Sequence, residues 1–381
     1  MEITGIICEY NPFHTGHLKQ FSMIREKNPD SAIVCLMSGN FVQRGMPAIF
    51  DKELRARAAI CCGADLVLEL PVTAALSSAE GFAASGVRIL GGFCNHLSFG
   101  AETPNIDVLL KTADALLSAD FTHNLREYLS EGISFPVARQ KALEQMGLDG
   151  DIVKSPNNIL AIEYCKAILS QNSKINPQPI LRQGDYHAQI PEKDNPSATS
   201  LRLMLENGEM CTDFVPPEAA GIYQNASVHA LSYGERAILY RLRTMTDEQY
   251  ASLPYGSEGL WRKLMKNART LSSLEEIIAA TKSKRYTRTR IDRMVMCAFL
   301  GLTQTDIDSP APYCCVLGFN DVGREILIKA RKTGNFPNLG EKIDHNFQKI
   351  ENRCDDLYGL FAEKGPECSG ITQNRRVFYK K

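Results

Sequence analysis

The sequence predicts an α/β fold in which a doubly wound parallel sheet is followed by a mostly α-helical C-terminal domain. Four apolar runs alternate with helical patterns in the first hundred residues, as strands joined by crossover helices do. Beyond residue 228, helical patterns follow one another without such runs. A chain of 381 residues commonly forms two domains, and Pro216 and Pro217 punctuate the region between the two patterns. We therefore predict domains at 1–205 and 206–381.

The elements of the predicted sheet follow in chain order. A first strand ends at Cys8 and leads through a turn into a helix at 18–27. Further strands are predicted at 32–37, 65–70, 96–99 and 179–181, with helices at 51–62 and 78–90 and a mostly helical stretch at 105–170. The carboxyl ends of parallel strands meet at one edge of a sheet, where ligands bind. We expect one mouth there, surrounded by 14–17, Ser38, Gly39, Pro71 and Gly100.

The turn after the first strand carries the sequence His14-Thr15-Gly16-His17. A helix that begins there offers unpaired backbone N–H groups and a partial positive charge to an anion. Gly16 lets a flat base or ribose approach the backbone, and the two imidazoles can donate hydrogen bonds to phosphate oxygens. This stretch is the predicted centre of the chemistry.

A second predicted helix start, at Ser197-Ala198-Thr199-Ser200-Leu201-Arg202, also suits an anion. One interpretation is an ordinary Ser or Thr N-cap. The other is a phosphate clamp made by Ser197, Thr199 and Arg202, which would hold the outer phosphates of a nucleotide bound at the first turn.

Charge is unevenly distributed along the chain. Residues 1–205 hold 18 Lys and Arg against 22 Asp and Glu, a net charge of −4, and the remainder holds 25 against 22, a net of +3. Ten basic residues lie between Trp261 and Met294. Arginine and lysine mixed with Tyr286 suit an RNA backbone and a stacked base, whereas the plainer alternative is a solvated helix face. The candidate RNA-binding residues are Lys282, Lys284, Arg285, Arg288, Arg290 and Arg293.

Other classes of protein fit the sequence less well. The twelve cysteines include no Cys-x-x-Cys pair, so we expect reduced thiols and no structural zinc site. The N-terminus has no basic region of a signal peptide, and the most apolar later stretch, 58–76, is broken by Asp65 and Glu69. We therefore expect a cytoplasmic protein that does not enter the membrane.

His-x-Gly-His after a first strand is similar to the signature of the nucleotidyltransferase superfamily, which includes class I aminoacyl-tRNA synthetases. A closer resemblance, over nearly the whole chain, is to the bacterial tRNA(Met) cytidine acetate ligase family. It is carried by Glu9-Tyr10-Asn11-Pro12-Phe13-His14-Thr15-Gly16-His17, Met37-Ser38-Gly39-Asn40-Phe41-Val42-Gln43-Arg44-Gly45, Ser155-Pro156-Asn157-Asn158-Ile159-Leu160, Lys284-Arg285-Tyr286-Thr287-Arg288-Thr289-Arg290 and Val316-Leu317-Gly318-Phe319-Asn320.

The resemblance implies a Rossmann-like nucleotidyltransferase domain and a reaction in two steps. Acetate and ATP would form acetyl-adenylate, and the acetyl group would pass to N4 of the wobble cytidine of elongator tRNA(Met), giving N4-acetylcytidine. His14 and His17 would be catalytic, with Mg²⁺ on the outer phosphates. The implied ATP-binding residues are Ile7, Cys8, Glu9, Tyr10, Asn11, Pro12, Phe13, His14, Thr15, Gly16, His17, Leu18, Lys19, Gln20, Gly100, Asn157 and Arg182.

One signature of class I synthetases, Lys-Met-Ser-Lys-Ser, is absent. The segment from Ser197 to Arg202 looks instead like the clamp of small-molecule adenylyltransferases. Two alternatives therefore stay open: an adenylyltransferase acting on a small phosphorylated metabolite, and a non-catalytic RNA-binding protein on a nucleotidyltransferase scaffold.

Overall fold

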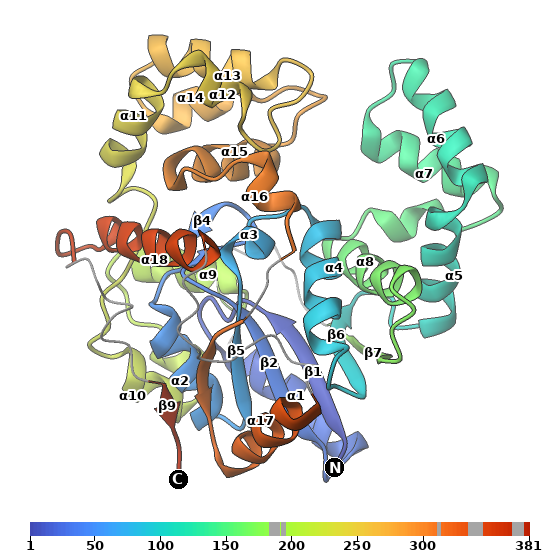
Figure 1. The fold of residues 1–381 in the computed structure, drawn as a ribbon, viewed down its shortest axis with the longest axis vertical. Helices are drawn as coiled ribbons and strands as arrows, with labels where there is room; N and C mark the ends of the chain where they lie inside the picture. Colours follow the sequence, from blue (N-terminus) through green and yellow to red (C-terminus); the bar gives the residue numbers. More distant parts are fainter. Residues whose placement is uncertain (183–190, 192–195, 311–313, 334–345, 368–376) are drawn as a thin grey trace.

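The computed structural model describes residues 1–182, 191, 196–310, 314–333, 346–367 and 377–381. A mostly parallel sheet lies at the centre of the lower part of the molecule, and a helical domain lies above it (Figure 1). The sheet has seven strands in the order β7-β6-β1-β2-β5-β8-β9. Their bounds are β1 Ile3–Cys8, β2 Ala32–Ser38, β5 Leu66–Leu70, β6 His96–Ala101, β7 Asn176–Leu181, β8 Val316–Phe319 and β9 Phe378–Tyr379.

Each central strand places alternate side chains on opposite faces, so the sheet has a hydrophobic core on each side. In β2, Val34 and Leu36 pack on one face, while Ile33 and Cys35 pack on the other, and all four are fully buried. The first face is covered by α4 Ala79–Leu90, α5 Ile106–Leu117, α8 Pro156–Ser170 and α17 Asp321–Thr333. The second is covered by α1 Thr15–Lys27, α2 Lys52–Cys61, α9 Ala198–Glu206 and α10 Pro217–Tyr223.

The doubly wound sheet is confirmed, with one strand in the reverse direction. β8 runs antiparallel to β5, whereas every other pairing in this sheet is parallel. The part of the chain after residue 205 therefore contributes β8, α17 and β9 to the sheet and its cover. The domain division at 205 remains a prediction.

The helical domain has a core of its own. It is built from α11 Glu235–Thr244, α12 Asp247–Ala251, α13 Leu260–Thr270, α14 Leu274–Thr281, α15 Arg288–Leu300 and α18 Asn346–Tyr358, with α16 Gln304–Asp308 at its edge. Phe41, Val72 and Leu76 from the sheet half enter this core, so the two halves share buried apolar surface. A hairpin of β3 Phe41–Val42 and β4 Met46–Pro47 lies between them.

Short elements complete the chain. They are α3 Val72–Ala75, α6 Ala119–Ser130, α7 Phe135–Gln145 and the 3₁₀ turns Gly150–Val153, Thr212–Phe214 and Gly359–Phe361. Helices α6 and α7 project beside the helical domain at the right of Figure 1. Among the described residues, every helix is too short or too polar to cross a bilayer.

Candidate active site

A pocket of about 300 Å³ lies where the strand order of the sheet reverses. From β1 the chain winds through α1 to β2 on one side, whereas β6 pairs with β1 on the other side. Loops diverge at such a switch point, which leaves a crevice beyond the carboxyl ends of the strands. The pocket is lined by the end of β1, the end of β6, the start of α8 and the β3–β4 hairpin.

The His-x-Gly-His turn forms the first turn of α1. His14 is its N-cap: Nδ1 of His14 accepts a hydrogen bond from the Gly16 N–H at 3.1 Å, and Nδ1 of His17 accepts one from the His14 N–H at 3.2 Å. Because both Nδ1 atoms act as acceptors, the proton of each neutral ring lies on Nε2. Both imidazoles are therefore oriented as Nε2–H donors.

Both rings are also kept neutral. Burial, and after it the charges of Arg182 and Arg202, lowers the pKa of His14 to about 3. Burial and the adjacent His14 and Arg182 hold the pKa of His17 well below its usual range. A neutral imidazole that donates from Nε2 can stabilise negative charge as it develops, without first losing or gaining a proton.

The two histidines differ in their access to the pocket. His17 lines it, whereas His14 lies beside it with 3% of its surface exposed, and the ring centroids are 3.8 Å apart. Nε2 of His14 is buried and has no hydrogen-bond partner among the described residues. Tyr10 and Phe13 contact the His17 ring edge-on and tilted, at centroid distances of 4.8 and 5.5 Å. An apolar cluster therefore fixes the direction of the donors.

Two arginines bring positive charge to the same side of the pocket. Nη1 of Arg202, on α9, donates to the carbonyl of Asn11 at 2.9 Å, which ties that helix to the histidine turn. Nη1 of Arg182, after β7, donates to Oδ1 of Asn157 at 2.9 Å. Together with His17, these side chains make a cationic wall suited to a triphosphate.

The N-terminus of α8 is already occupied by a carboxylate of the chain. Glu102 accepts from the side chain of Asn157 at 2.7 Å and from the backbone N–H of Asn158 at 2.7 Å. An external anion would have to displace Glu102 to bind at that helix end. We interpret Glu102 as the support that orients Asn157 and, through it, Arg182.

The structure brings only part of the predicted ATP-binding segment to the pocket. The predicted ATP-binding residues that line the pocket are Ile7, Cys8, Glu9, Tyr10, Asn11, His17, Gln20, Gly100, Asn157 and Arg182. The others from the segment are not among the lining residues: Pro12, Phe13, His14, Thr15, Gly16, Leu18 and Lys19. Phe13 is fully buried and Lys19 is exposed, so these side chains support the turn or face solvent.

Only part of the predicted phosphate clamp lines the pocket. Arg202 lines the pocket, but Oγ of Ser197 accepts from the Ser200 N–H at 3.0 Å and so caps its own helix. Thr199 accepts a hydrogen bond from Nη2 of Arg202 at 3.1 Å. Ser197 thus makes the ordinary N-cap, and Thr199 holds the arginine.

Sequence reasoning missed several pocket residues, among them two adjacent polar ones. Gln43 and Arg44, from the β3–β4 hairpin, line the pocket next to Glu9. The backbone N–H of Gln43 donates to Oε1 of Glu9 at 2.7 Å. A short polar loop gives no sign that it folds back over a strand end, so only the resemblance of the surrounding segment could have indicated it.

We expected Ser38, Gly39 and Pro71 to surround the ligand pocket at the edge of the sheet. This expectation is wrong. The guanidinium of Arg55 is fully buried and donates to the carbonyls of Glu9 at 2.6 Å, Ser38 at 3.1 Å and Gly39, so it closes the ends of β1 and β2. Pro71 caps the short helix α3. None of the three lines the pocket.

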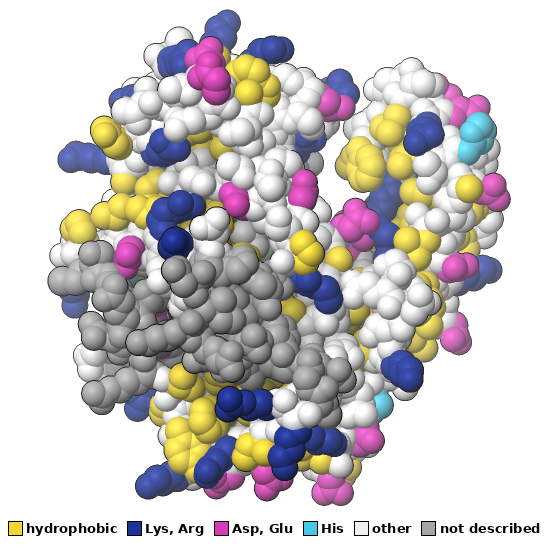
Figure 2. Space-filling model, in the orientation of Figure 1, with side chains coloured by type: hydrophobic (Ala, Val, Ile, Leu, Met, Phe, Trp, Pro, Cys, Tyr) yellow, Lys and Arg dark blue, Asp and Glu magenta, His cyan; other side chains and the backbone are white. Residues whose placement is uncertain are grey.

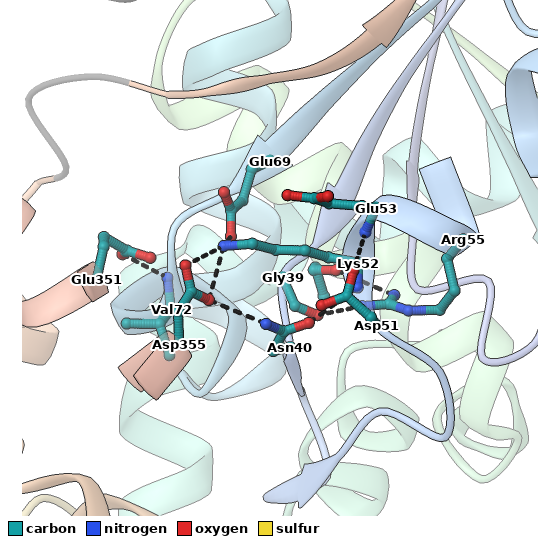
Figure 3. A network of polar contacts seen from close by, with 11 residues as sticks. Gly39, Asn40, Asp51, Lys52, Glu53, Arg55, Glu69, Val72, Glu351 and Asp355 are labelled. Carbon is teal, nitrogen blue, oxygen red and sulfur yellow. Dashed lines mark hydrogen bonds and ion pairs between the residues drawn. The ribbon is translucent and has the colours of Figure 1, made fainter. Parts of the chain in front are cut away.

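A buried ionic cluster fills the edge beyond β2 and β5 (Figure 3). Nζ of Lys52 lies 2.6 Å from Oε1 of Glu69 and 2.5 Å from Oδ2 of Asp355, and Asn40 donates to Asp355 at 3.0 Å. Glu351 accepts from the Val72 N–H at 2.8 Å. Burial, and then the charge of Glu69, raises the pKa of Glu351 to about 8. These bonds fasten α18 to the sheet.

The candidate RNA-binding residues fall into two groups. Lys282, Lys284, Arg285 and Arg288 are exposed, although Arg285 pairs with Glu258 at 2.6 Å and Arg288 with Glu275 at 2.5 Å. Arg290 donates to the Tyr255 carbonyl, and Arg293 lies over the Tyr255 ring, so both help to hold the fold. Basic side chains are spread over the helical domain on the face in Figure 2, with acidic ones between them.

Comparisons with known proteins agree with this geometry. The HIGH Nucleotidyl Transferase family matches residues 1–370. A tRNA(Met) cytidine acetate ligase from Clostridium novyi is 39% identical, covering 88% of this chain and 89% of its own length. One from Clostridium tetani is 37% identical, with 96% of each chain covered.

Solved structures give the same result for the fold. Apo Thermotoga maritima TmcAL superposes with a TM-score of 0.92 at 28% identity, covering 100% of this chain and 99% of the other. The same protein bound with alpha-thio ATP gives 0.89 at 27% identity, with the same coverage. The chain therefore belongs to the HIGH nucleotidyl transferase family and, within it, to the tRNA(Met) cytidine acetate ligases.

Proposed function

We propose that this protein is an ATP-dependent ligase that activates acetate as acetyl-adenylate and acetylates N4 of the wobble cytidine of elongator tRNA(Met). The observation that carries the proposal is the pocket at the strand-order reversal. Neutral His17 and two arginines from separate elements, Arg182 and Arg202, converge there on one wall. Relatives that cover nearly the whole chain carry the name of this activity.

In the first step, a carboxylate oxygen of acetate attacks the α-phosphorus of ATP. A new O–P bond forms, the bond to the bridging oxygen breaks, and pyrophosphate leaves with the electron pair. Negative charge builds on the equatorial and leaving oxygens, where the Nε2–H of His17 and the guanidinium groups of Arg182 and Arg202 would donate hydrogen bonds. His14 would act directly once a phosphate oxygen reaches its unpartnered Nε2.

Mg²⁺ belongs to this proposal as an ion that neutralises the outer phosphates. Glu9 is the single carboxylate among the described residues that line the pocket, and no cluster of three potential ligands occurs in the described chain. We infer that the ion would be held chiefly by phosphate oxygens and water, as Mg²⁺ commonly is.

The second step needs the tRNA, for which the helical domain is the proposed platform. Lys282, Lys284, Arg285 and Arg288 are exposed and can exchange their internal ion pairs for phosphates. We propose Arg290 and Arg293 mainly as supports of this surface, because both are bonded or stacked within the fold.

Incubation with ATP, acetate and tRNA tests the proposal. The expected products are AMP, pyrophosphate and tRNA whose N4-acetylcytidine is detected by mass spectrometry of the nucleosides. A requirement for acetyl-CoA with inert acetate would overturn it. AMP transfer to a phosphorylated metabolite would favour an adenylyltransferase, and RNA binding without turnover would favour a non-catalytic protein.

A further inference from the structure

Charge is unevenly distributed among the residues that line the pocket. Arg182 and Arg202 lie near the histidine turn, where their charges act on His14, whereas Glu9, with Arg44 in the same pocket, is the single acidic side chain among the described lining residues. A triphosphate is repelled by a carboxylate and attracted by the arginines. The phosphates therefore belong beside His17, Arg182 and Arg202, and the Glu9 carboxylate is suited to another group that the pocket binds.

Glu9 is held in a defined position. Its Oε1 accepts from the Gln43 N–H at 2.7 Å, and its carbonyl accepts from Nη1 of Arg55 at 2.6 Å. The other carboxylate oxygen, Oε2, makes no hydrogen bond or ion pair within the described part of the chain. Glu9 is thus fixed at its backbone carbonyl and at Oε1, and its Oε2 remains available to a ligand in the pocket.

The hairpin next to Glu9 contacts the basic helical domain. The hairpin residues beside Glu9 are followed by Gly45, whose φ is +77°, and a Cβ added there would lie 2.5 Å from the backbone of Asp292 and Arg293 on α15. The hairpin therefore rests directly on the helix that begins at Arg288. The hairpin thus places Gln43 and Arg44, with Glu9 beside them, next to the domain that is proposed to bind the tRNA.

We propose that Glu9, with Gln43 and Arg44 beside it, forms the subsite for the amine nucleophile, and that Oε2 of Glu9 accepts a hydrogen bond from N4 of the cytosine. This inference rests on the proposed function. Carboxylates are suited to accept from cytosine N4. The N4 lone pair is delocalised into the ring, so the amine gains nucleophilicity as it gives up a proton.

The transfer step forms one C–N bond and breaks one C–O bond. N4 attacks the carbonyl carbon of acetyl-adenylate and forms the C–N bond. The bond from that carbon to the phosphate oxygen breaks, and AMP leaves with the electron pair. One N4 proton passes to Oε2 of Glu9 and from there to solvent. The adenylation step requires no proton acceptor, so Glu9 acts as a base in the transfer step alone.

Glu9→Gln tests the proposal, because the glutamine oxygen can still accept from the Gln43 N–H while its NH₂ presents a donor to the incoming amine. Three rates are measured on wild type and variant: acetate-dependent ATP–pyrophosphate exchange, acetohydroxamate formation with hydroxylamine, and acetylation of tRNA. Hydroxylamine is a strong nucleophile that traps acyl-adenylates without a base. The ratio of the acetylation rate to the exchange rate should fall about 10²–10⁴-fold, the contribution of a positioned proton acceptor, whereas the ratio of hydroxamate formation to exchange should stay as in wild type.

Glu102→Gln is the matched control, since it changes a carboxylate beneath the cationic wall. It should slow exchange, hydroxamate formation and acetylation in parallel through Asn157 and Arg182. Glu9→Asp, which keeps the carboxylate, should restore part of the acetylation lost in Glu9→Gln.

If Glu9→Gln slows all three rates together, Glu9 serves adenylation or Mg²⁺ binding, and the inference is wrong. Unchanged acetylation would also overturn it. If wild type shows no acetate-dependent exchange, the proposed function itself fails, independently of Glu9.

Discussion

At the carboxyl ends of β1 and β6, polar side chains surround an open pocket, whereas at the ends of β2 and β5 they bond to one another and are buried. His17 and Arg182 face a cavity of about 300 Å³. Lys52, by contrast, lies between Glu69 and Asp355 with 3% of its side chain exposed. The two regions belong to one edge of one sheet, so topology alone does not decide where a ligand binds. The second region is filled because α18 supplies two carboxylates to it.

Removing the central cation of the buried cluster should have the largest effect. Lys52→Met leaves Glu69 and Asp355 without their cation in the interior, which typically costs about 3–5 kcal/mol of unfolding free energy. Urea unfolding followed by circular dichroism measures it. The control is Lys154→Met, which breaks the exposed pair with Asp151 and should change stability little. Equal losses of unfolding free energy in Lys52→Met and Lys154→Met would contradict the contrast between the buried cluster and an exposed ion pair.

His17→Asn should have the opposite profile, with a large effect on catalysis and a small one on stability. The asparagine oxygen can still accept from the His14 N–H, but the Nε2–H donor is lost. Removal of such a donor lowers the adenylation rate about 10²–10³-fold, or ~2.7–4 kcal/mol. Acetate-dependent ATP–pyrophosphate exchange measures the rate. A variant that exchanges at the wild-type rate would show that the pocket's donors do not serve this step.

Glu351 should make stability depend on pH. Its pKa rises from 4.5 when unfolded to about 8 in the fold, where it is buried near Glu69, Lys52 and Asp355. Between these values the folded state holds a proton that the unfolded state has lost. Its contribution to stability is therefore present below pH 4.5 and falls as the pH rises towards 8.

Glu351→Gln removes this titration while keeping an oxygen that can accept from the Val72 N–H. The variant should therefore gain stability relative to wild type between pH 6 and about pH 8.5. Urea unfolding at both pH values measures the difference. Parallel pH profiles for the two proteins would mean that Glu351 is ionised in the fold.

The smallest effect is expected on the helical surface. Lys282 and Lys284 are exposed, and their replacement by alanine should weaken tRNA binding and lower its salt dependence by up to about two counterions. Acetate-dependent exchange should persist, because the pocket is untouched. Filter binding at several salt concentrations measures the slope. A variant that loses exchange as well would indicate a folding role for this stretch.

Much of the sheet was predictable because buried parallel strands are continuous apolar runs. The run at 32–37 predicted β2, which extends one residue further to Ser38. Strands β8 and β9 were missed because they have four and two residues, and their pairing depends on contacts far along the chain.

The site was predictable where it is local and was missed where it depends on tertiary contacts. His14 and His17 are recognisable in a nine-residue motif that folds as one turn. Lys52 and Arg55 are charged residues in a helical pattern and would be expected at the surface, but the fold buries both. Gln43 and Arg44 reach the pocket because the hairpin that carries them rests on α15.

Acetate-dependent ATP–pyrophosphate exchange, measured without tRNA, tests the central claim most directly. The pocket at the β1–β6 reversal is predicted to form acetyl-adenylate by itself. Wild type should therefore exchange labelled pyrophosphate into ATP when acetate is present and stop when acetate is withheld. Exchange that ignores acetate, or no exchange until tRNA is added, would contradict this account.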